Sequence, residues 1–399
     1  MTDEYGSFGR RKDLLSDLTD TATGDGPGGS VRAAVACLGE PSPVKRDTLA
    51  SPPVADGDTV AAPERAASAV EVELDLYGLR VQVGGDWTEV VAELGLDFWW
   101  FSRAPGGLRD VEVLVEQGAP EYDRFGEVTA SFITPRNVVY QQGDRTIVDY
   151  FGRAVSVLDR ERGSLLVRGF DKHLVHEAAY HYILSSAGQH LDARGLPRLH
   201  SLALAAPSGA VAVLLPSGGG KSTLALRALA DERVRILAED TALIDRRGRL
   251  HPFPLRMGIN TTDSHALPPE HVRRIERMEL HPKLALNPEA FADRVERSAQ
   301  PLRHLVIGRR SLGRDADLAP IGRTAAVGAL FREAVVGVGV YQGMEFILQR
   351  GMRDVAGKTG VIATRMACCG AGLARAKVWR LTLGRDHERN WQALAPLLR

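Results

Sequence analysis

The sequence predicts a mixed α/β protein in which a strand-rich N-terminal module precedes a second, larger α/β domain. Two patterns lead to this prediction. Short segments of alternating apolar and polar residues follow one another between residues 70 and 169, at the spacing of hairpins. An apolar strand, a glycine-rich turn and a helix then occur in that order between residues 210 and 230. The 399 residues, of which 44% are hydrophobic, suffice for two or three globular domains.

Composition excludes several classes of protein and partner. Fifty basic and fifty acidic side chains cancel, which removes any general attraction to nucleic acid or to an anionic membrane, and we expect neither as a partner. The three cysteines, Cys37, Cys368 and Cys369, form neither a disulfide framework nor a C-x-x-C zinc pair. The first residues lack the apolar segment of a secretory signal, so we expect a cytoplasmic protein.

We expect the chain to have three parts. Residues 1–67 are rich in glycine and proline and contain few large apolar residues, which predicts a disordered tail. Residues 68–195 form the strand-rich module, which ends in a helix over residues 172–194. Residues 196–399 form the second domain.

The strands of the module are expected to pair antiparallel. Residues 70–83 alternate as a half-buried strand does, and Gly84 and Gly85 supply the turn after it. Glycines also separate several of the later segments, as hairpin turns require. These further strands are expected at residues 111–116, 138–140, 146–151, 154–159 and 164–169.

The helix over residues 172–194 contains a partial match to a zinc motif. His176, Glu177 and His181 resemble H-E-x-x-H, but the second histidine comes five residues after the first. That spacing places the two side chains about 140° apart around a helix. We therefore expect these histidines to pack or to face solvent.

The segment that is most informative about function is AVAVLLPSGGGKSTLALRALA, residues 210–230. Its glycines carry no side chain that would keep phosphate oxygens from the backbone N–H groups, and the helix start adds the positive end of a dipole. Lys221 is expected to neutralise the β- and γ-phosphates, and Ser222 or Thr223 to offer magnesium a hydroxyl ligand. The predicted ATP- and magnesium-binding loop is Ser217, Gly218, Gly219, Gly220, Lys221, Ser222 and Thr223.

Two features accompany this loop, which departs from the consensus G-x-x-x-x-G-K-[ST] at its first glycine, where Leu215 stands. Downstream, an apolar strand over residues 234–238 ends in Glu239 and Asp240. A carboxylate there is suited to hold magnesium or to orient an attacking hydroxyl. Upstream, His200 precedes Lys221 by twenty-one residues, at the head of a strand-like segment.

His200, the loop and the acid pair together resemble the C-terminal kinase domain of HPr kinase/phosphorylase, whose fold and loop are similar to those of phosphoenolpyruvate carboxykinase. The resemblance covers about residues 199–383 and is tightest over residues 200–244. It implies a P-loop kinase domain that uses ATP and Mg²⁺. The module before it looks more like HPr-kinase-related proteins encoded with peptide-modification systems, some of which phosphorylate a serine on a ribosomally made peptide.

The resemblance also implies roles for single residues. Lys221 and Ser222 match the phosphate and magnesium ligands, and His200 matches the active-site histidine. Asp240 matches the second of two acids, which helps hold magnesium, while Glu239 replaces the first, which is the base on the acceptor serine. The family's order thus places Glu239 at the acceptor and Asp240 at the metal, although the longer side chain of Glu239 leaves the choice of base open. Arg256 is expected to contact phosphate or substrate.

The rest of the chain predicts common elements. A surface helix is expected over residues 268–278, strands over 306–310, 334–340 and 377–383, and a closing helix over 389–398. Cys368 and Cys369 are expected to be a buried pair of small residues.

The function expected from these features is transfer of the ATP γ-phosphate to a serine of a protein or peptide. Two alternatives stay open: a module that binds nucleotide and recruits a partner without transfer, and a kinase or carboxykinase acting on a small molecule. The sequence leaves open whether the chain forms a homo-oligomer.

Overall fold

The structure, a computed structural model, describes residues 71–104, 106–216, 218–259, 267, 269–275, 283–336 and 359–399. The expected tail and Ser217 lie outside these ranges. Within them the chain is mixed α/β, as the sequence predicts, with two nine-stranded sheets and one three-stranded sheet. None of the helices in the described ranges is both long enough and apolar enough to cross a membrane.

The N-terminal sheet has the strand order β3-β1-β2-β4-β9-β8-β7-β6-β5. The expectation of a single strand over residues 70–83 is wrong. Tyr77 and Gly78, with φ values of 59° and 89°, form a tight turn that splits this segment into a hairpin. The strands are β1 Val72–Leu76, β2 Leu79–Gly85, β3 Ser102–Arg103, β4 Val111–Gln117, β5 Ala130–Ile133, β6 Val138–Gln142, β7 Arg145–Asp149, β8 Ala154–Asp159 and β9 Ser164–Gly169.

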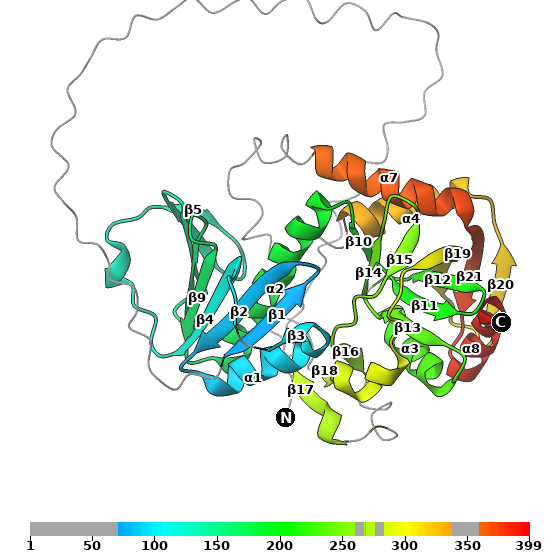
Figure 1. The fold of residues 1–399 in the computed structure, drawn as a ribbon, viewed down its shortest axis with the longest axis horizontal. Helices are drawn as coiled ribbons and strands as arrows, with labels where there is room; N and C mark the ends of the chain where they lie inside the picture. Colours follow the sequence, from blue (N-terminus) through cyan, green and yellow to red (C-terminus); the bar gives the residue numbers. More distant parts are fainter. Residues whose placement is uncertain are drawn as a thin grey trace, which may run out of the picture. The chain divides into compact units, whose positions relative to one another are not determined.

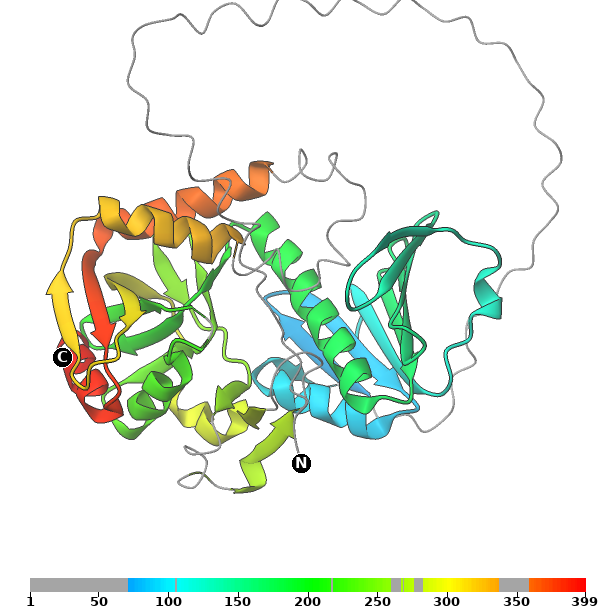
Figure 2. The same cartoon turned by 180° about the vertical axis from the view of Figure 1, so that it is seen from behind.

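Part of this sheet is parallel, in contrast to the antiparallel module that we expected. β4 pairs parallel with both β2 and β9. A parallel neighbour requires a crossover connection, and α1 (Thr88–Asp97), which the sequence did not reveal, provides it between β2 and β4. The expected long helix is present as α2 (Lys172–Ala193), whose N-terminus is capped by the Asp171 side chain. Figure 2 shows α2 lying along one face of the sheet.

The C-terminal sheet has a central path β10-β14-β15-β19-β12-β11-β13, and β21 joins β19 to β20. β12, β19 and β21 are parallel neighbours, so their carboxyl ends lie at the same edge of the sheet. The strands are β10 Arg198–His200, β11 Leu202–Ala206, β12 Gly209–Leu214, β13 Arg235–Ala238, β14 Thr241–Ile244, β15 Arg249–His251, β19 Gln300–Arg310, β20 Asp317–Pro320 and β21 Lys377–Leu383.

Helices cover both faces of this sheet (Figure 1). α3 and α8 pack together on one face, and α4 and α7 lie on the other. The small third sheet has the order β16-β18-β17. The bounds of these elements are α3 Lys221–Ala230, α4 Thr324–Phe331, α7 Thr359–Arg375, α8 His387–Leu394, β16 Met257–Ile259, β17 Val272–Ile275 and β18 Lys283–Leu286.

Two expected elements differ from the structure. Residues 272–275, within the expected surface helix, form strand β17, because they pair with β18 instead of closing a helical turn. Residues 334–336, within an expected strand, belong to a π-helical turn η6 (Arg332–Val336), and residues 337–340 lie outside the described ranges. The strands at 306–310 and 377–383 are confirmed, as are the closing helix and the burial of Cys368 and Cys369.

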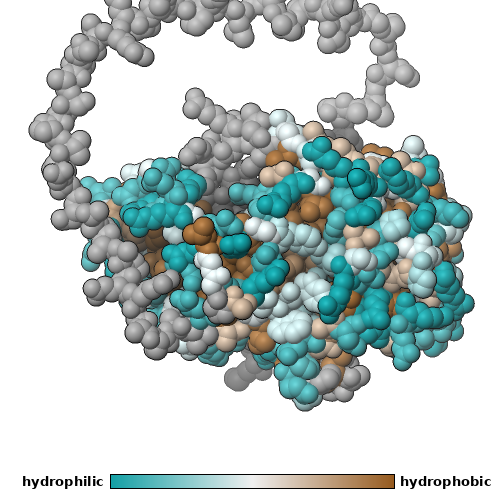
Figure 3. Space-filling model, viewed as in Figure 1, coloured by the Kyte–Doolittle hydropathy of each residue, from teal (hydrophilic) through white to brown (hydrophobic). Residues whose placement is uncertain are grey.

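β12, the strand that leads into the glycine loop, is buried on both of its faces. Ala210, Ala212 and Leu214 pack in the core shared with the N-terminal sheet. Val211 and Val213 pack on the other face, in a second core that includes residues of α3 and α8. Each fully buried valine or leucine contributes about 1.5–3 kcal/mol to the stability of the fold, so the end of the strand fixes the position of the first residues of the loop. Hydrophilic residues predominate on the face seen in Figure 3, with smaller apolar areas between them.

Candidate active site

The predicted glycine loop connects β12 to α3. Gly218 and Gly220 have φ values of 74° and 107°, a region that side chains other than glycine's rarely adopt. Gly220 is also the N-cap of α3, and no side chain caps the helix, so its first N–H groups are left for another acceptor. This is the strand, loop and helix geometry that binds phosphate in other proteins.

Strand pairing brings His200 and the acid pair to this loop. In the β10–β14 pair His200 lies opposite Thr241, so Asp240 is adjacent to the histidine. The β11–β12 pair aligns Leu202 with Val213, which carries His200 toward the end of β12. Three segments that are separate in the sequence therefore meet at the carboxyl end of β12.

The side chains that meet there are in direct contact. The Lys221 ammonium donates to the carbonyl of Leu215 at 2.8 Å and lies 2.7 Å from Nε2 of His200 and 3.4 Å from Oδ1 of Asp240. Nε2 of His200 is also 3.0 Å from that same carboxylate oxygen. The sequence-predicted lysine, histidine and second acid thus form one polar cluster.

The two acids occupy opposite positions from those that the family's order implies. The Ser222 hydroxyl donates to Oε1 of Glu239 at 2.6 Å, whereas Asp240 contacts His200 and Lys221. The family's order implied Asp240 at the magnesium held by Ser222, but the acid in contact with this serine in the structure is Glu239. Neighbouring residues in the bend between β13 and β14 do project to different sides, but the first acid points to the loop serine. The Asp240 side chain is 49% exposed, while Glu239 is buried.

The surroundings shift the pKa values of Glu239, Asp240 and His200 in different directions. Burial raises the pKa of Glu239, and repulsion from Asp240 adds to this, against the hydrogen bond from Ser222. Burial also opposes ionisation of Asp240, but the hydrogen bond and charge of His200, with Lys221, lower its pKa. For His200, burial favours the neutral ring, yet the hydrogen bonds with Asp240 and Glu333 prevail and raise the pKa to about 9.

Arg256 is not brought to the glycine loop. Its guanidinium lies 4.0 Å from the ring centre of Tyr180, and Nη1 is 2.5 Å from Oδ2 of Asp97. Asp97 is fully buried and also contacts Arg273 and His176. Arg256, which we expected to contact phosphate or substrate, is therefore part of a buried ionic cluster instead. His176 belongs to that cluster, in agreement with the expectation that it packs in the protein interior.

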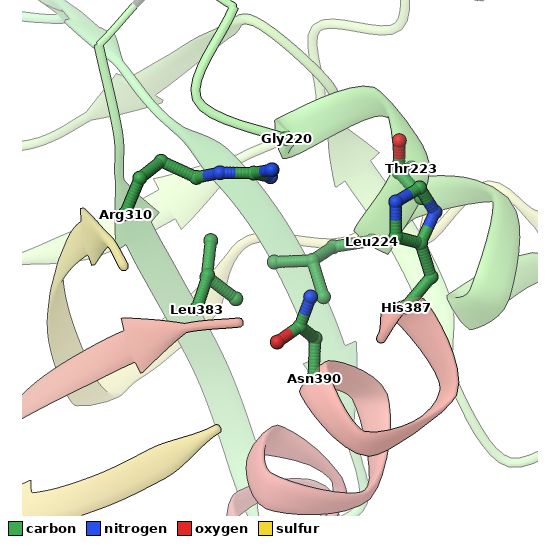
Figure 4. Close-up of a pocket in the computed structure, with 7 residues that line it drawn as sticks. All are labelled: Gly220, Thr223, Leu224, Arg310, Leu383, His387 and Asn390. Carbon is green, nitrogen blue, oxygen red and sulfur yellow. The ribbon is translucent and has the colours of Figure 1, made fainter. Parts of the chain in front are cut away.

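Arg310 also lies at the loop, although no sequence pattern marks it. It ends β19, and its guanidinium points toward Gly220 (Figure 4), where a Cβ would be 3.3 Å from Nη1. A small pocket opens between this arginine and the start of α8. Its lining residues are Gly220, Thr223, Leu224, Arg310, Leu383, His387 and Asn390.

Glu333 is a second site residue without a local sequence signal. Its Oε2 is 2.8 Å from Nδ1 of His200, and its side chain is 7% exposed. It stands 133 residues after the histidine, so only the fold brings the two together.

The residues present fit a magnesium ion bound together with phosphate. Among the residues that the structure describes, no group of three or more His, Cys, Asp or Glu could hold a metal by itself. Magnesium commonly uses one or two carboxylates and completes its octahedron with water and phosphate oxygens. The Ser222 hydroxyl and the Glu239 carboxylate, two hard oxygen donors in contact beside the loop, supply such a partial set. No protein-family model matches the chain, and no curated protein is similar enough to match it.

Proposed function

We propose that this protein is an ATP-dependent kinase that transfers the γ-phosphate to a serine hydroxyl of a protein or peptide. The observation that supports this best is the meeting of Lys221, His200, Glu239 and Asp240 at a glycine loop between a buried strand and a helix. Phosphoryl transfer needs positioning and charge stabilisation more than covalent chemistry, and these groups supply both. The choice of serine rests on the family resemblance.

The glycine loop would bind the phosphates through its N–H groups, and Lys221 would exchange its contacts with Leu215 and His200 for phosphate oxygens. Ser222 and Glu239 would hold Mg²⁺, which neutralises charge on the phosphates.

Asp240 is the acid in position to orient the acceptor. It is partly exposed and carries a lowered pKa because, although burial opposes its ionisation, His200 and Lys221 stabilise its charge. The serine oxygen forms a bond to the γ-phosphorus while the bond from that phosphorus to the β–γ bridging oxygen breaks. The serine proton passes to the Asp240 carboxylate, and ADP leaves.

The two sides of the loop would receive different parts of the nucleotide. His200, Asp240 and Glu239 lie on one side, and none of them lines the pocket of Thr223, Arg310 and His387. The γ-phosphate belongs with the acids, so the α-phosphate and the nucleoside extend toward Arg310.

The test is to incubate the full chain with γ-labelled ATP, magnesium and a peptide library whose central residue is serine, threonine or alanine. Mass spectrometry should locate phosphate on serine. Lys221→Met, which keeps the apolar stem, should reduce transfer about 10²- to 10³-fold, because one charged donor to the transferring group is lost. Undiminished transfer by this variant would place the active site elsewhere.

The same experiment separates the alternatives. Nucleotide that binds in calorimetry but is never consumed would indicate a recruitment module. Phosphate that reaches only small molecules would indicate a small-molecule kinase. Either result rejects the proposed transfer to a protein or peptide.

A further inference from the structure

We infer that Glu333 is a positioning residue, which holds the ring of His200 so that Nε2 faces the Lys221–Asp240 pair. The inference deepens the proposed function and rests on it for its effect on catalysis. The contact itself, between Oε2 of Glu333 and Nδ1 of His200 at 2.8 Å, belongs to the fold.

The chemistry of this contact restricts the ring. A carboxylate can only accept hydrogen bonds, so Nδ1 of His200 must donate. The ring then has one nitrogen left, Nε2, and this atom lies 2.7 Å from the Lys221 ammonium and 3.0 Å from Oδ1 of Asp240. Burial lowers the pKa of His200, but the hydrogen bonds with Asp240 and Glu333 raise it overall to about 9, so Nε2 also carries a proton near neutral pH and donates to Asp240. Departure of Lys221 to phosphate removes the ammonium beside Nε2 and leaves this N–H directed at the acid that orients the acceptor.

Glu333 is held mainly by its burial, since its side chain is 7% exposed. Its second oxygen, Oε1, accepts from Nε of Arg332 at 3.2 Å, but the arginine is 67% exposed, so this bond adds little. It lies in the π-helical turn η6, which follows α4 directly. π-Helical turns are rare and occur often at functional sites, where they redirect a side chain that a regular helix would aim elsewhere.

Two conservative variants separate reach from charge. Glu333→Gln keeps the length of the side chain and an acceptor oxygen for Nδ1–H, but loses the charge. Glu333→Asp keeps the charge but is one methylene too short for the 2.8 Å contact. If Glu333 positions the ring, the glutamine variant retains activity and the aspartate variant loses it. A purely electrostatic role gives the reverse order.

The first measurement is independent of catalysis. Nitrogen NMR of the full chain with ¹⁵N-labelled histidine, with the His200 signal assigned by its loss in His200→Gln, should show a protonated Nδ1 in the wild type and in Glu333→Gln. In Glu333→Asp the Nδ1 signal should shift, because the partner is out of reach. A His200 spectrum identical in all three proteins would overturn the inference.

The second measurement is steady-state ADP formation from magnesium-ATP in the presence of the serine peptides. Glu333→Asp should lower kcat about 10- to 100-fold with an unchanged KM for ATP, as is typical when the partner of a functional histidine is lost. Glu333→Gln should stay within a few fold of wild type. Arg332→Ala, which removes the exposed partner of the other oxygen, is the control and should match wild type. A Glu333→Asp variant with normal kcat would reject the positioning role, whereas a wild type that never consumes ATP rejects the proposed function and leaves the NMR result to decide the contact.

Discussion

The hydroxyl of Ser222 donates a 2.6 Å hydrogen bond to Oε1 of Glu239. The acid beside the loop serine is thus the first of the pair, and the second acid contacts His200 and Lys221. Because consecutive side chains in this segment project to different sides, the two acids cannot exchange roles without rebuilding the bend between β13 and β14.

We expect Glu239→Gln and Asp240→Asn to affect different steps. An amide is a poor ligand for a hard cation, so Glu239→Gln should weaken the affinity for magnesium-ATP but not for metal-free ATP. Asp240→Asn leaves the Ser222 contact intact, so its affinity should stay near wild type while transfer slows about 10²- to 10⁴-fold. Calorimetry with and without magnesium, and single-turnover transfer, measure both effects. The opposite pattern would restore the assignment that the family resemblance implies.

Arg310→Ala should lower the affinity for ADP about tenfold or more, because a charge-assisted hydrogen bond contributes about 1.5–3 kcal/mol. Arg309→Ala is the matched control. It removes the same charge one residue earlier on β19, where Nε donates to the hydroxyl of Thr382 instead. Calorimetric titration of ADP into both variants compares them. Equal losses would mean that Arg310 acts only through the general field of the protein and does not contact the nucleotide.

The stability contribution of His200 should depend on pH in a defined direction. Burial and the positive charge of nearby Lys221 lower the pKa of His200. The hydrogen bonds with Asp240 and Glu333 outweigh both effects and raise this pKa to about 9. The native state thus binds this proton more tightly than the unfolded chain, whose histidine pKa is about 6.5. The stabilisation is therefore complete below pH about 6.5 and is lost as the pH rises through about 9.

His200→Gln should accordingly lower the free energy of unfolding most near pH 6, by at most about 3 kcal/mol, and least above pH 9. Urea unfolding of both proteins at several pH values, without nucleotide or metal, measures the difference. A difference that stays constant or grows toward high pH would show that the histidine is not protonated in the native state.

Asp97→Ala should destabilise the fold by about 3–5 kcal/mol, because it leaves the buried guanidinium groups of Arg256 and Arg273 without their carboxylate. Asp317→Ala, at an exposed position on β20, is the control and should change the free energy of unfolding by less than about 0.5 kcal/mol. Urea unfolding of the two variants provides the comparison, and equal values would mean that the Asp97 cluster adds nothing to stability.

The glycine loop, His200 and the acid pair could be found from sequence because each has a local pattern around it. The direction in which each acid projects could not be predicted, because the sequence Glu239-Asp240 does not indicate which of the two side chains points to Ser222. Glu333 and Arg310 had no local signal. Glu333 lies 133 residues from its partner His200 in the sequence. Arg310 does not stand out because all but seven of the fifty basic residues are arginine.

The fold was predictable to a similar degree. Alternation located most strands, but the turn at Tyr77 and Gly78 was hidden because the apolar pattern continues across it. Pairing direction depends on connections between strands, and α1, which makes β2 and β4 parallel, was not evident in the sequence. The segment at Val272–Ile275 became a strand through its partner β18, which is a tertiary effect that helix periodicity does not record.

The burial of β12 on both faces makes the strand a reporter for the loop that it carries. Its amide hydrogens can exchange with solvent only when both cores open together. A ligand on the loop stabilises the native state by RT ln(1 + [L]/Kd), and every such opening must first release that ligand. Exchange of the β12 amides therefore slows when a ligand occupies the loop, although these amides do not contact the ligand.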